Sequence, residues 1–391
     1  MRESRAAAVH PRLRRTEVSE VPFVDLAAQY RRLKPQIDAR IQAVLGHGQF
    51  IMGPEVTELE AALGKFAGCE HAIAVSSGTD ALSMALMVEG IGPGHAVLVP
   101  AFTFPATAEA IVLAGARPVF VDVDARTFNI DTEHLSAQIE TVKRDGRLEA
   151  RAIMPVDLFG LPADHAEIGK IAAEHDMLVI ADGAQSFGGR VGDVRVGALA
   201  PITTTSFFPA KPLGCFGDGG AIFTNDSERA EVLRSIRTHG ESRANNEILR
   251  IGMNGRLDTL QAAILLAKLA AFPEELEARE QLATHYDSRL SEAVTVPMRQ
   301  EGKSSAWAQY SILLEDRDRV AAALREAGIP SAVYYSTPLH LQPAYAEFGD
   351  GNASLPVSES LSLRILSLPM HPDMEGASAD RICDSLLEAI P

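Results

Sequence analysis

The sequence predicts an α/β protein, with a mostly parallel central sheet covered by helices and a smaller C-terminal α+β unit. Two observations carry this prediction. From about residue 50, helical patterns alternate with short, almost wholly apolar runs, which are typical of parallel strands buried on both faces. With 391 residues, the chain is also long enough for one large domain and a smaller one, and it can bury most of the surface of its unfolded form.

The large unit begins with a helix and a short strand. Residues 55–67 carry apolar side chains at helical spacing, and residues 72–76 form a short apolar run. A Ser-Ser-Gly-Thr-Asp turn separates this run from a second helix, expected over 79–89. Six further apolar runs predict strands at 96–100, 118–122, 152–156, 177–181, 203–207 and 220–224.

The end of the large unit is predicted at a proline that follows a strong helix. Over residues 256–270, apolar side chains share one helical face, and Pro273 comes shortly afterwards. We therefore expect four parts: a disordered extension (1–20), an N-terminal segment (21–50), a large domain (51–272) and a small C-terminal domain (273–391). Within the small domain, the patterns predict strands at 307–314 and 329–335 and helices at 317–327 and 376–389.

Composition and charge exclude several classes of function. The 36 basic and 52 acidic residues give a net charge of −16, which disfavours binding to nucleic acid or to an anionic membrane surface. No apolar run approaches the length of about 20 residues that a membrane helix needs. The three cysteines are widely spaced and form neither a disulfide framework nor a metal-ligand pattern. A cytoplasmic protein without a metal site is the expectation.

The first candidate site residues lie in the turn Ser76-Ser77-Gly78-Thr79-Asp80. Free amides at a helix N-terminus, with hydroxyl groups beside them, form a binding site for an anion such as a phosphate. Glycine permits a close approach of the backbone to that anion. The alternative is an ordinary helix cap, since Ser, Thr and Asp are common capping residues.

Two ionisable residues complete a candidate constellation. Asp182 ends a buried strand and is followed by Gln185, while Lys211 stands among Phe, Pro and Leu residues. A desolvated lysine has a lowered pKa and a nucleophilic amine, although its stem can instead pack on apolar surface with the amine in water. Together, the phosphate-binding turn, the carboxylate and the lysine suit pyridoxal phosphate. This cofactor needs a lysine for a Schiff base and an acid beside its ring nitrogen.

Longer motifs carry a resemblance to a known family. The stretches SSGTDAL, VPAFTFPATAEAI, PVFVDVD, IADGAQSFG, SFFPAKPLGCFGDGGAIFT and NGRLDTLQAAIL together resemble the DegT/DnrJ/StrS sugar aminotransferases, which are fold-type-I pyridoxal phosphate enzymes. The resemblance covers residues 21–391. The segment FVDLAAQY…GHGQFIMGPEV is similar to the N-terminus of the members that aminate carbon 3 of UDP-2-acetamido-2-deoxy-3-oxo-glucuronate.

The resemblance implies a role for each matching residue. Lys211 corresponds to the Schiff-base lysine and Asp182 to the partner of the pyridine nitrogen, and both are expected to be catalytic. Gln185 corresponds to the residue near the phenolic oxygen of the cofactor, and Phe104 to the aromatic residue stacked on its ring. The phosphate ligands are expected to be Gly78, Thr79 and Ser206, together with Asn254 from the neighbouring subunit of a homodimer with shared active sites.

The resemblance further implies ping-pong transfer of an amino group from L-glutamate to a keto-sugar nucleotide. Arg243, Arg256 and His340 are the candidates for substrate binding. The segment HGESRANNEILRIG at 239–252 departs from the glucuronate pattern, because the stretch between its HG and IG pairs lacks the aromatic residue and histidines that are usual there. Two alternatives stay open: a keto-cyclitol aminotransferase that uses glutamine, and a regulatory protein that binds pyridoxal phosphate without turnover.

Overall fold

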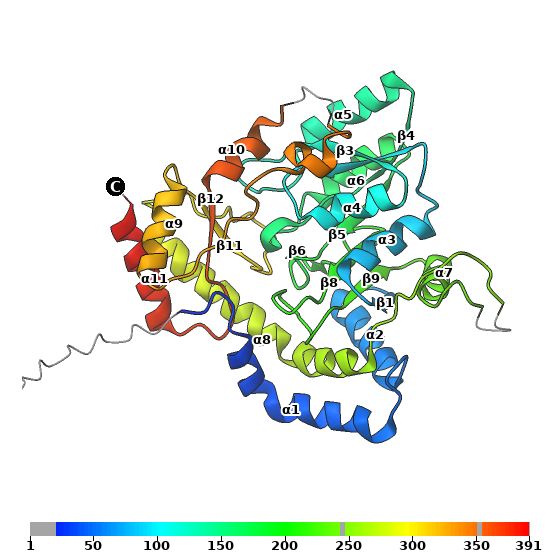
Figure 1. Ribbon diagram of the computed structural model, residues 1–391, viewed down its shortest axis with the longest axis horizontal. Helices are drawn as coiled ribbons and strands as arrows, with labels where there is room; N and C mark the ends of the chain where they lie inside the picture. Colours follow the sequence, from blue (N-terminus) through cyan, green and yellow to red (C-terminus); the bar gives the residue numbers. More distant parts are fainter. Residues whose placement is uncertain (1–20, 243–246, 350–353, 391) are drawn as a thin grey trace, which may run out of the picture.

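The computed structural model describes residues 21–242, 247–349 and 354–390, and it confirms the α/β class. A seven-stranded sheet with the order β1-β9-β8-β5-β4-β2-β3 lies in the large unit (Figure 1). The neighbouring strands are parallel except where β9 pairs with β1 and β8. The strands are β1 (His71–Val75), β2 (His95–Pro100), β3 (Arg117–Val121), β4 (Glu149–Ile153), β5 (Leu178–Asp182), β8 (Ile202–Ser206) and β9 (Gly220–Thr224).

Helices cover both faces of this sheet. They are α2 (Pro54–Ala67), α3 (Gly78–Val88), α4 (Pro105–Leu113), α5 (Thr132–Asp145), α6 (His165–Glu174), α7 (Ser227–Arg237) and α8 (Thr259–Leu290). Successive side chains of a strand point to opposite faces. In β1, Ile73 and Val75 therefore pack in the cluster that contains α3 and α4, whereas Ala72 and Ala74 pack with α2 and α8.

The helix α8 is longer than the sequence pattern predicts. It begins at Thr259 instead of residue 256 and continues through Pro273 to Leu290. Proline removes one hydrogen bond of a helix and does not always end it. The apolar residues up to Leu276 pack in the large unit and those from Leu282 in the small unit. The predicted domain boundary at 272/273 thus lies inside a continuous helix (Figure 1).

The small unit packs two antiparallel strands against helices. These are β11 (Tyr310–Leu313), β12 (Ile365–Leu368), α9 (Arg317–Glu326), α10 (Pro356–Arg364) and α11 (Gly376–Ala389). The strand predicted at 329–335 is wrong, because only Ala332 forms a bridge, to Ser367. The strand predicted at 307–314 is shorter than expected, since Trp307 has a φ of 49° and cannot belong to a regular strand.

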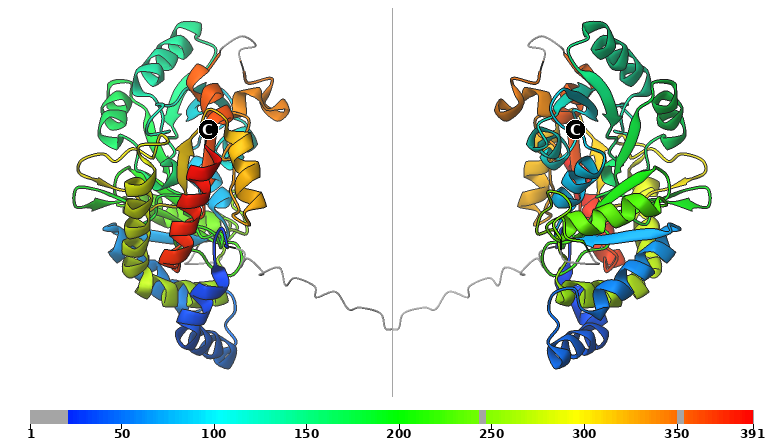
Figure 2. Two further views of the ribbon diagram at one scale, coloured as in Figure 1. Left: turned by 90° about the vertical axis from the view of Figure 1, so that its left-hand side faces the viewer. Right: turned by 90° about the vertical axis from the view of Figure 1, so that its right-hand side faces the viewer.

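The N-terminal segment forms α1 (Leu26–His47), which lies along the outside of the molecule (Figure 2). Its Leu33 and Ile37 pack on Ile264 and Ala267 of α8. A small sheet of β6 (Arg190–Val191), β7 (Val194–Arg195) and β10 (Lys303–Ser304) joins the two units, and the sequence patterns did not predict it. The predicted extension 1–20 lies outside the described residues. Among the described helices, none is both long and apolar enough to cross a membrane.

Candidate active site

A cavity of about 410 Å³ lies at the carboxyl ends of β5 and β8, beside the N-terminus of α3. Open α/β sheets commonly place ligands at this edge. Residues from the small unit, Tyr334 and Tyr335, form part of its wall. The cavity is lined by seven of the residues predicted from the sequence: Gly78, Thr79, Phe104, Asp182, Gln185, Ser206 and Lys211.

The N-terminus of α3 opens into this cavity. Ser77 is the N-cap, and its Oγ accepts a hydrogen bond from the amide of Asp80 at 3.0 Å. The helix-cap interpretation is therefore correct for Ser77, while the next two residues line the cavity. A Cβ on Gly78 would lie 2.7 Å from the Cβ of Ser206, so the close approach of α3 to β8 requires glycine here. A helix N-terminus of this kind attracts an anion.

Asp182 is a buried carboxylate at the end of β5. Its Oδ2 accepts a hydrogen bond from Thr107 Oγ1 at 2.9 Å, and its Oδ1 accepts one from the amide of Ala184 at 3.0 Å. Burial raises the pKa of this carboxyl, although the two hydrogen bonds and the charge of Lys211 oppose the shift. In the described part of the chain, the two hydrogen-bond donors to this carboxylate are neutral groups. A protonated ring nitrogen in the cavity would compensate its charge.

Lys211 lies in a turn after β8, where its amide donates a hydrogen bond to the carbonyl of Phe208 at 2.8 Å. Burial lowers the pKa of its amine, and the negative charge of Asp182 acts in the opposite direction. A lowered pKa increases the neutral fraction of the amine, which is the form that attacks a carbonyl carbon. The position of Lys211 in the same cavity as Asp182 suits covalent chemistry on a bound ring.

The side chain of Gln185 is oriented by its neighbours. Its Oε1 accepts a hydrogen bond from the amide of Phe159 at 2.6 Å, and its Nε2 donates one to the hydroxyl of Tyr335 at 3.2 Å. Phe104 is the N-cap of α4 and is 56% exposed, so its ring is open to contact a ligand. Tyr335 also makes an edge contact with Phe102 at 5.8 Å between ring centroids.

Thr107 and Tyr335 are among the residues of this site that the sequence patterns did not predict. Thr107, which holds Asp182, lies on α4, and Tyr335 comes from the small unit. A threonine within a helix and a tyrosine pair in a predicted strand carry no signal of their own. Only the fold brings them to the carboxyl ends of the large sheet.

Of the remaining predicted residues, those that the structure describes do not line this cavity. Asn254 is exposed, and Arg256 pairs with Val75 at the end of β1. The Arg256 Nε is buried and has no hydrogen-bond partner among the described residues. His340 lies beside a separate cavity of about 50 Å³, where its Nε2 lies 3.2 Å from Glu359 Oε1. Arg243 lies outside the described residues.

These features fit pyridoxal phosphate. A buried carboxylate would face the ring nitrogen, the helix N-terminus with Ser206 would hold the phosphate, and Lys211 would reach the aldehyde carbon. Among the described residues, no group of three or more His, Cys, Asp or Glu side chains is arranged to hold a metal ion.

Comparisons with known proteins agree with this geometry. Residues 31–387 match the DegT/DnrJ/EryC1/StrS aminotransferase family. A relative from Pseudomonas aeruginosa, UDP-2-acetamido-2-deoxy-3-oxo-D-glucuronate aminotransferase, is 47% identical over 94% of this chain and 99% of its own length. The crystal structure of a DegT DnrJ EryC1 StrS aminotransferase from Brucella abortus is 51% identical, with a TM-score of 0.93 over 94% and 99% of the two chains.

A third comparison concerns the cofactor. The crystal structure of NtdA from Bacillus subtilis, with bound cofactor PMP, is 29% identical to this chain. It has a TM-score of 0.88 over 96% of this chain and 86% of that protein.

Proposed function

This chain belongs to the DegT/DnrJ/EryC1/StrS aminotransferase family, and from that premise we propose that it transfers an amino group from L-glutamate to the 3-keto group of a UDP-2-acetamido-3-oxo-glucuronate sugar. It is a pyridoxal phosphate-dependent aminotransferase. The substrate proposal is supported by the Pseudomonas relative, which is 47% identical over nearly the whole chain. The observation that carries the chemistry is the meeting of Lys211 and Asp182 in one cavity.

When bound, the cofactor stores the amino group between the two half-reactions and withdraws electrons from the reacting carbon. The residues of the chain have separate tasks. Asp182 would face the ring nitrogen and favour its protonated form, and the amides of Gly78 and Thr79 with the Ser206 hydroxyl would bind the phosphate. Lys211 Nζ would be the amine that holds the cofactor and, when free, would accept and return the proton at the carbon that carries the amino group.

We also propose that two copies of the chain share their active sites. The support is a set of large apolar side chains that are exposed in the described chain: Phe50, Ile51, Met52, Phe208, Phe216, Ile248, Leu249 and Ile251. Monomeric proteins rarely expose many such side chains together. Asn254 is exposed in the same part of the sequence as the last three, which suits a contact with the phosphate of a neighbouring subunit.

The first experiment follows the absorption spectrum of the purified protein with pyridoxal phosphate. Adding L-glutamate should convert the spectrum of the lysine-bound cofactor to that of its aminated form, with release of 2-oxoglutarate. A spectrum that responds to L-glutamine and not to L-glutamate would favour a keto-cyclitol substrate instead. A protein that binds the cofactor but aminates no keto sugar or keto-cyclitol would favour the regulatory alternative.

The second experiment identifies the sugar. UDP-2-acetamido-2-deoxy-3-oxo-glucuronate should be aminated faster than the analogue that carries a hydroxymethyl group in place of the carboxylate. Arg256 bridges to Val75, two residues before the cavity-lining Ser77, and is the proposed contact for the anionic part of the substrate. Arg256→Gln should therefore raise KM for the sugar nucleotide more than it changes kcat, whereas equal rates for the two sugars would contradict the glucuronate proposal.

A further inference from the structure

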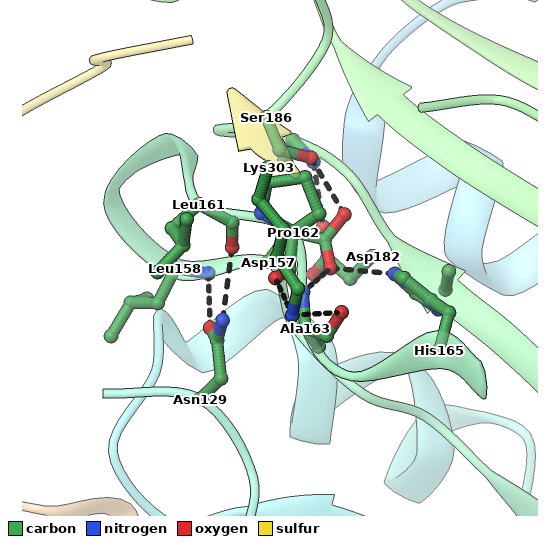
Figure 3. A network of polar contacts seen from close by, with 12 residues as sticks. Asn129, Asp157, Leu158, Leu161, Pro162, Ala163, His165, Asp182, Ser186 and Lys303 are labelled. Carbon is green, nitrogen blue, oxygen red and sulfur yellow. Dashed lines mark hydrogen bonds and ion pairs between the residues drawn. The ribbon is translucent and has the colours of Figure 1, made fainter. Parts of the chain in front are cut away.

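Asp157 is a buried carboxylate that has no role in the reaction described above. It follows β4 and has no exposed surface. Its carboxylate accepts hydrogen bonds from the amide of Ala163, from His165 Nε2 and from Ser186 Oγ, each at 2.8 Å (Figure 3). A buried charge is stable only when several hydrogen bonds satisfy it, and this carboxylate is surrounded by them.

His165 supplies one of these donors, and its Nε2 points toward Asp157 Oδ1. Its Nδ1 is buried without a hydrogen-bond partner among the described residues. Nε2 is therefore the ring nitrogen through which His165 contacts Asp157. Lys303 lies nearby, but its Nζ donates to the carbonyls of Pro162 and Ala163. The contacts to the Asp157 carboxylate therefore come from a backbone amide, a histidine ring and a hydroxyl group.

The segment that begins at Asp157 contacts the cofactor-binding loop 182–186 at three points. The Asp157 amide donates to the carbonyl of Asp182 at 3.1 Å. The Phe159 amide donates to Gln185 Oε1 at 2.6 Å, and Ser186 Oγ donates to Asp157 Oδ2 at 2.8 Å. Because Ser186 directly follows Gln185, the last contact fixes the backbone that carries the Gln185 side chain.

We propose that Asp157 is a positioning residue for amino transfer, which fixes through Ser186 the loop that presents Asp182 and Gln185 to the cofactor and adds negative potential behind the ring nitrogen. The inference rests on the proposed function. The electrostatic part has independent support, since Asp157 is one of the groups that raise the pKa of the Asp182 carboxyl. Two nearby carboxylates repel each other and together favour a cation or proton placed against them.

Two variants separate the positioning contact from the charge. Asp157→Asn keeps the shape, and its amide can still accept from Ala163 and donate to Ser186, so chiefly the charge is removed. Ser186→Ala removes the contact and leaves the charge. Asp122→Asn is the matched control: Asp122 is also buried at the end of a strand and accepts bonds from Val357 and Ser358 at the start of α10, away from the cofactor-binding loop.

The measurements are the dissociation constant of pyridoxal phosphate from titration of the apoprotein, the ¹⁵N chemical shift of its ring nitrogen, and the Tm of each apoprotein. Asp157→Asn should weaken cofactor binding by about 10- to 100-fold and shift the ring-nitrogen signal toward the unprotonated form. Ser186→Ala should weaken binding without that spectral shift. Asp122→Asn should lower Tm and keep the wild-type dissociation constant.

The result that would overturn the inference is an Asp157→Asn protein whose cofactor affinity and ring-nitrogen signal match those of the Asp122→Asn control. If Asp157→Asn does not fold, Ser186→Ala decides, and wild-type affinity in that variant overturns the positioning role. A wild-type protein that fails to bind pyridoxal phosphate would overturn the proposed function itself, and that outcome is visible before any variant is made.

Discussion

The cofactor side and the substrate side of this protein are built differently. On the cofactor side, Asp182 and Ser206 end two buried strands and Lys211 follows the second, so that the sheet itself brings them to one cavity. On the substrate side, Arg256 and His340 lie in connecting segments and do not line that cavity. Residues at strand ends are fixed by hydrogen bonding within the sheet, whereas residues on loops depend on contacts that differ between relatives.

The largest effect expected from this comparison concerns Lys211. Lys211→Ala should reduce turnover by at least about 1,000-fold, because the variant lacks the amine that attaches the cofactor and moves the proton. Single-turnover assays with L-glutamate and with the keto sugar measure this loss. Turnover near the wild-type rate would show that the cofactor side has been assigned to the wrong chemistry.

A smaller loss is expected from Asp182→Asn, which keeps the shape and removes the charge beside the ring nitrogen. Removing one preorganised electrostatic contact in an active site typically costs about 100- to 1,000-fold in kcat. The asparagine Oδ1 can still accept from the Ala184 amide, and its Nδ2 can donate to Thr107 Oγ1, so the Tm should change little. A large fall in Tm with an unchanged kcat would assign Asp182 to stability instead of catalysis.

Lys268 contacts the loop that follows Lys211, and its contribution to stability can be tested by varying the pH. Burial lowers the pKa of Lys268 to about 8, and its Nζ donates at 2.7 Å to the carbonyl of Gly214, in the loop that follows Lys211. In the unfolded chain, the lysine keeps its ordinary pKa of 10.5 and therefore binds more protons than the folded protein between pH 8 and 10.5. The free energy of unfolding should rise with pH through this window, by at most about 3 kcal/mol.

Urea unfolding at pH 7, 8.5 and 10 measures this rise, with Lys268→Met as the comparison. The variant lacks the titrating group, so its stability should rise less than that of the wild type between pH 8.5 and 10. Parallel curves for the two proteins would show that Lys268 does not titrate in this range.

The smallest effect is expected on the substrate side, at His340. The structure places this residue in a separate cavity beside Glu359, although the sequence predicted a contact with substrate. His340→Ala should cost about 1 kcal/mol of stability and keep kcat/KM within about twofold of the wild type. A large rise in KM for the sugar nucleotide alone would restore the sequence-based prediction and would sharpen the limits of the comparison.

What could be predicted from the sequence divides in the same way, between residues at strand ends and residues that only the fold brings together. The apolar runs of β1 and β9 and the motifs around Asp182 and Lys211 depend on local pattern, and the structure places them as predicted. The strand predicted at 329–335 failed because apolar character alone does not provide a partner strand. Thr107 and Tyr335 were missed because their roles exist only after distant segments have met.

The continuity of α8 has a consequence for how this chain can be rearranged. Phe272 belongs to the core of the large unit, and Tyr286 on the same helix belongs to the core of the small unit. Cutting the chain at 272/273 would divide one helix between two fragments and leave each fragment with an incomplete core. Recombination between relatives that exchanges the C-terminal unit must therefore place the join outside α8, so that the whole helix comes from one parent.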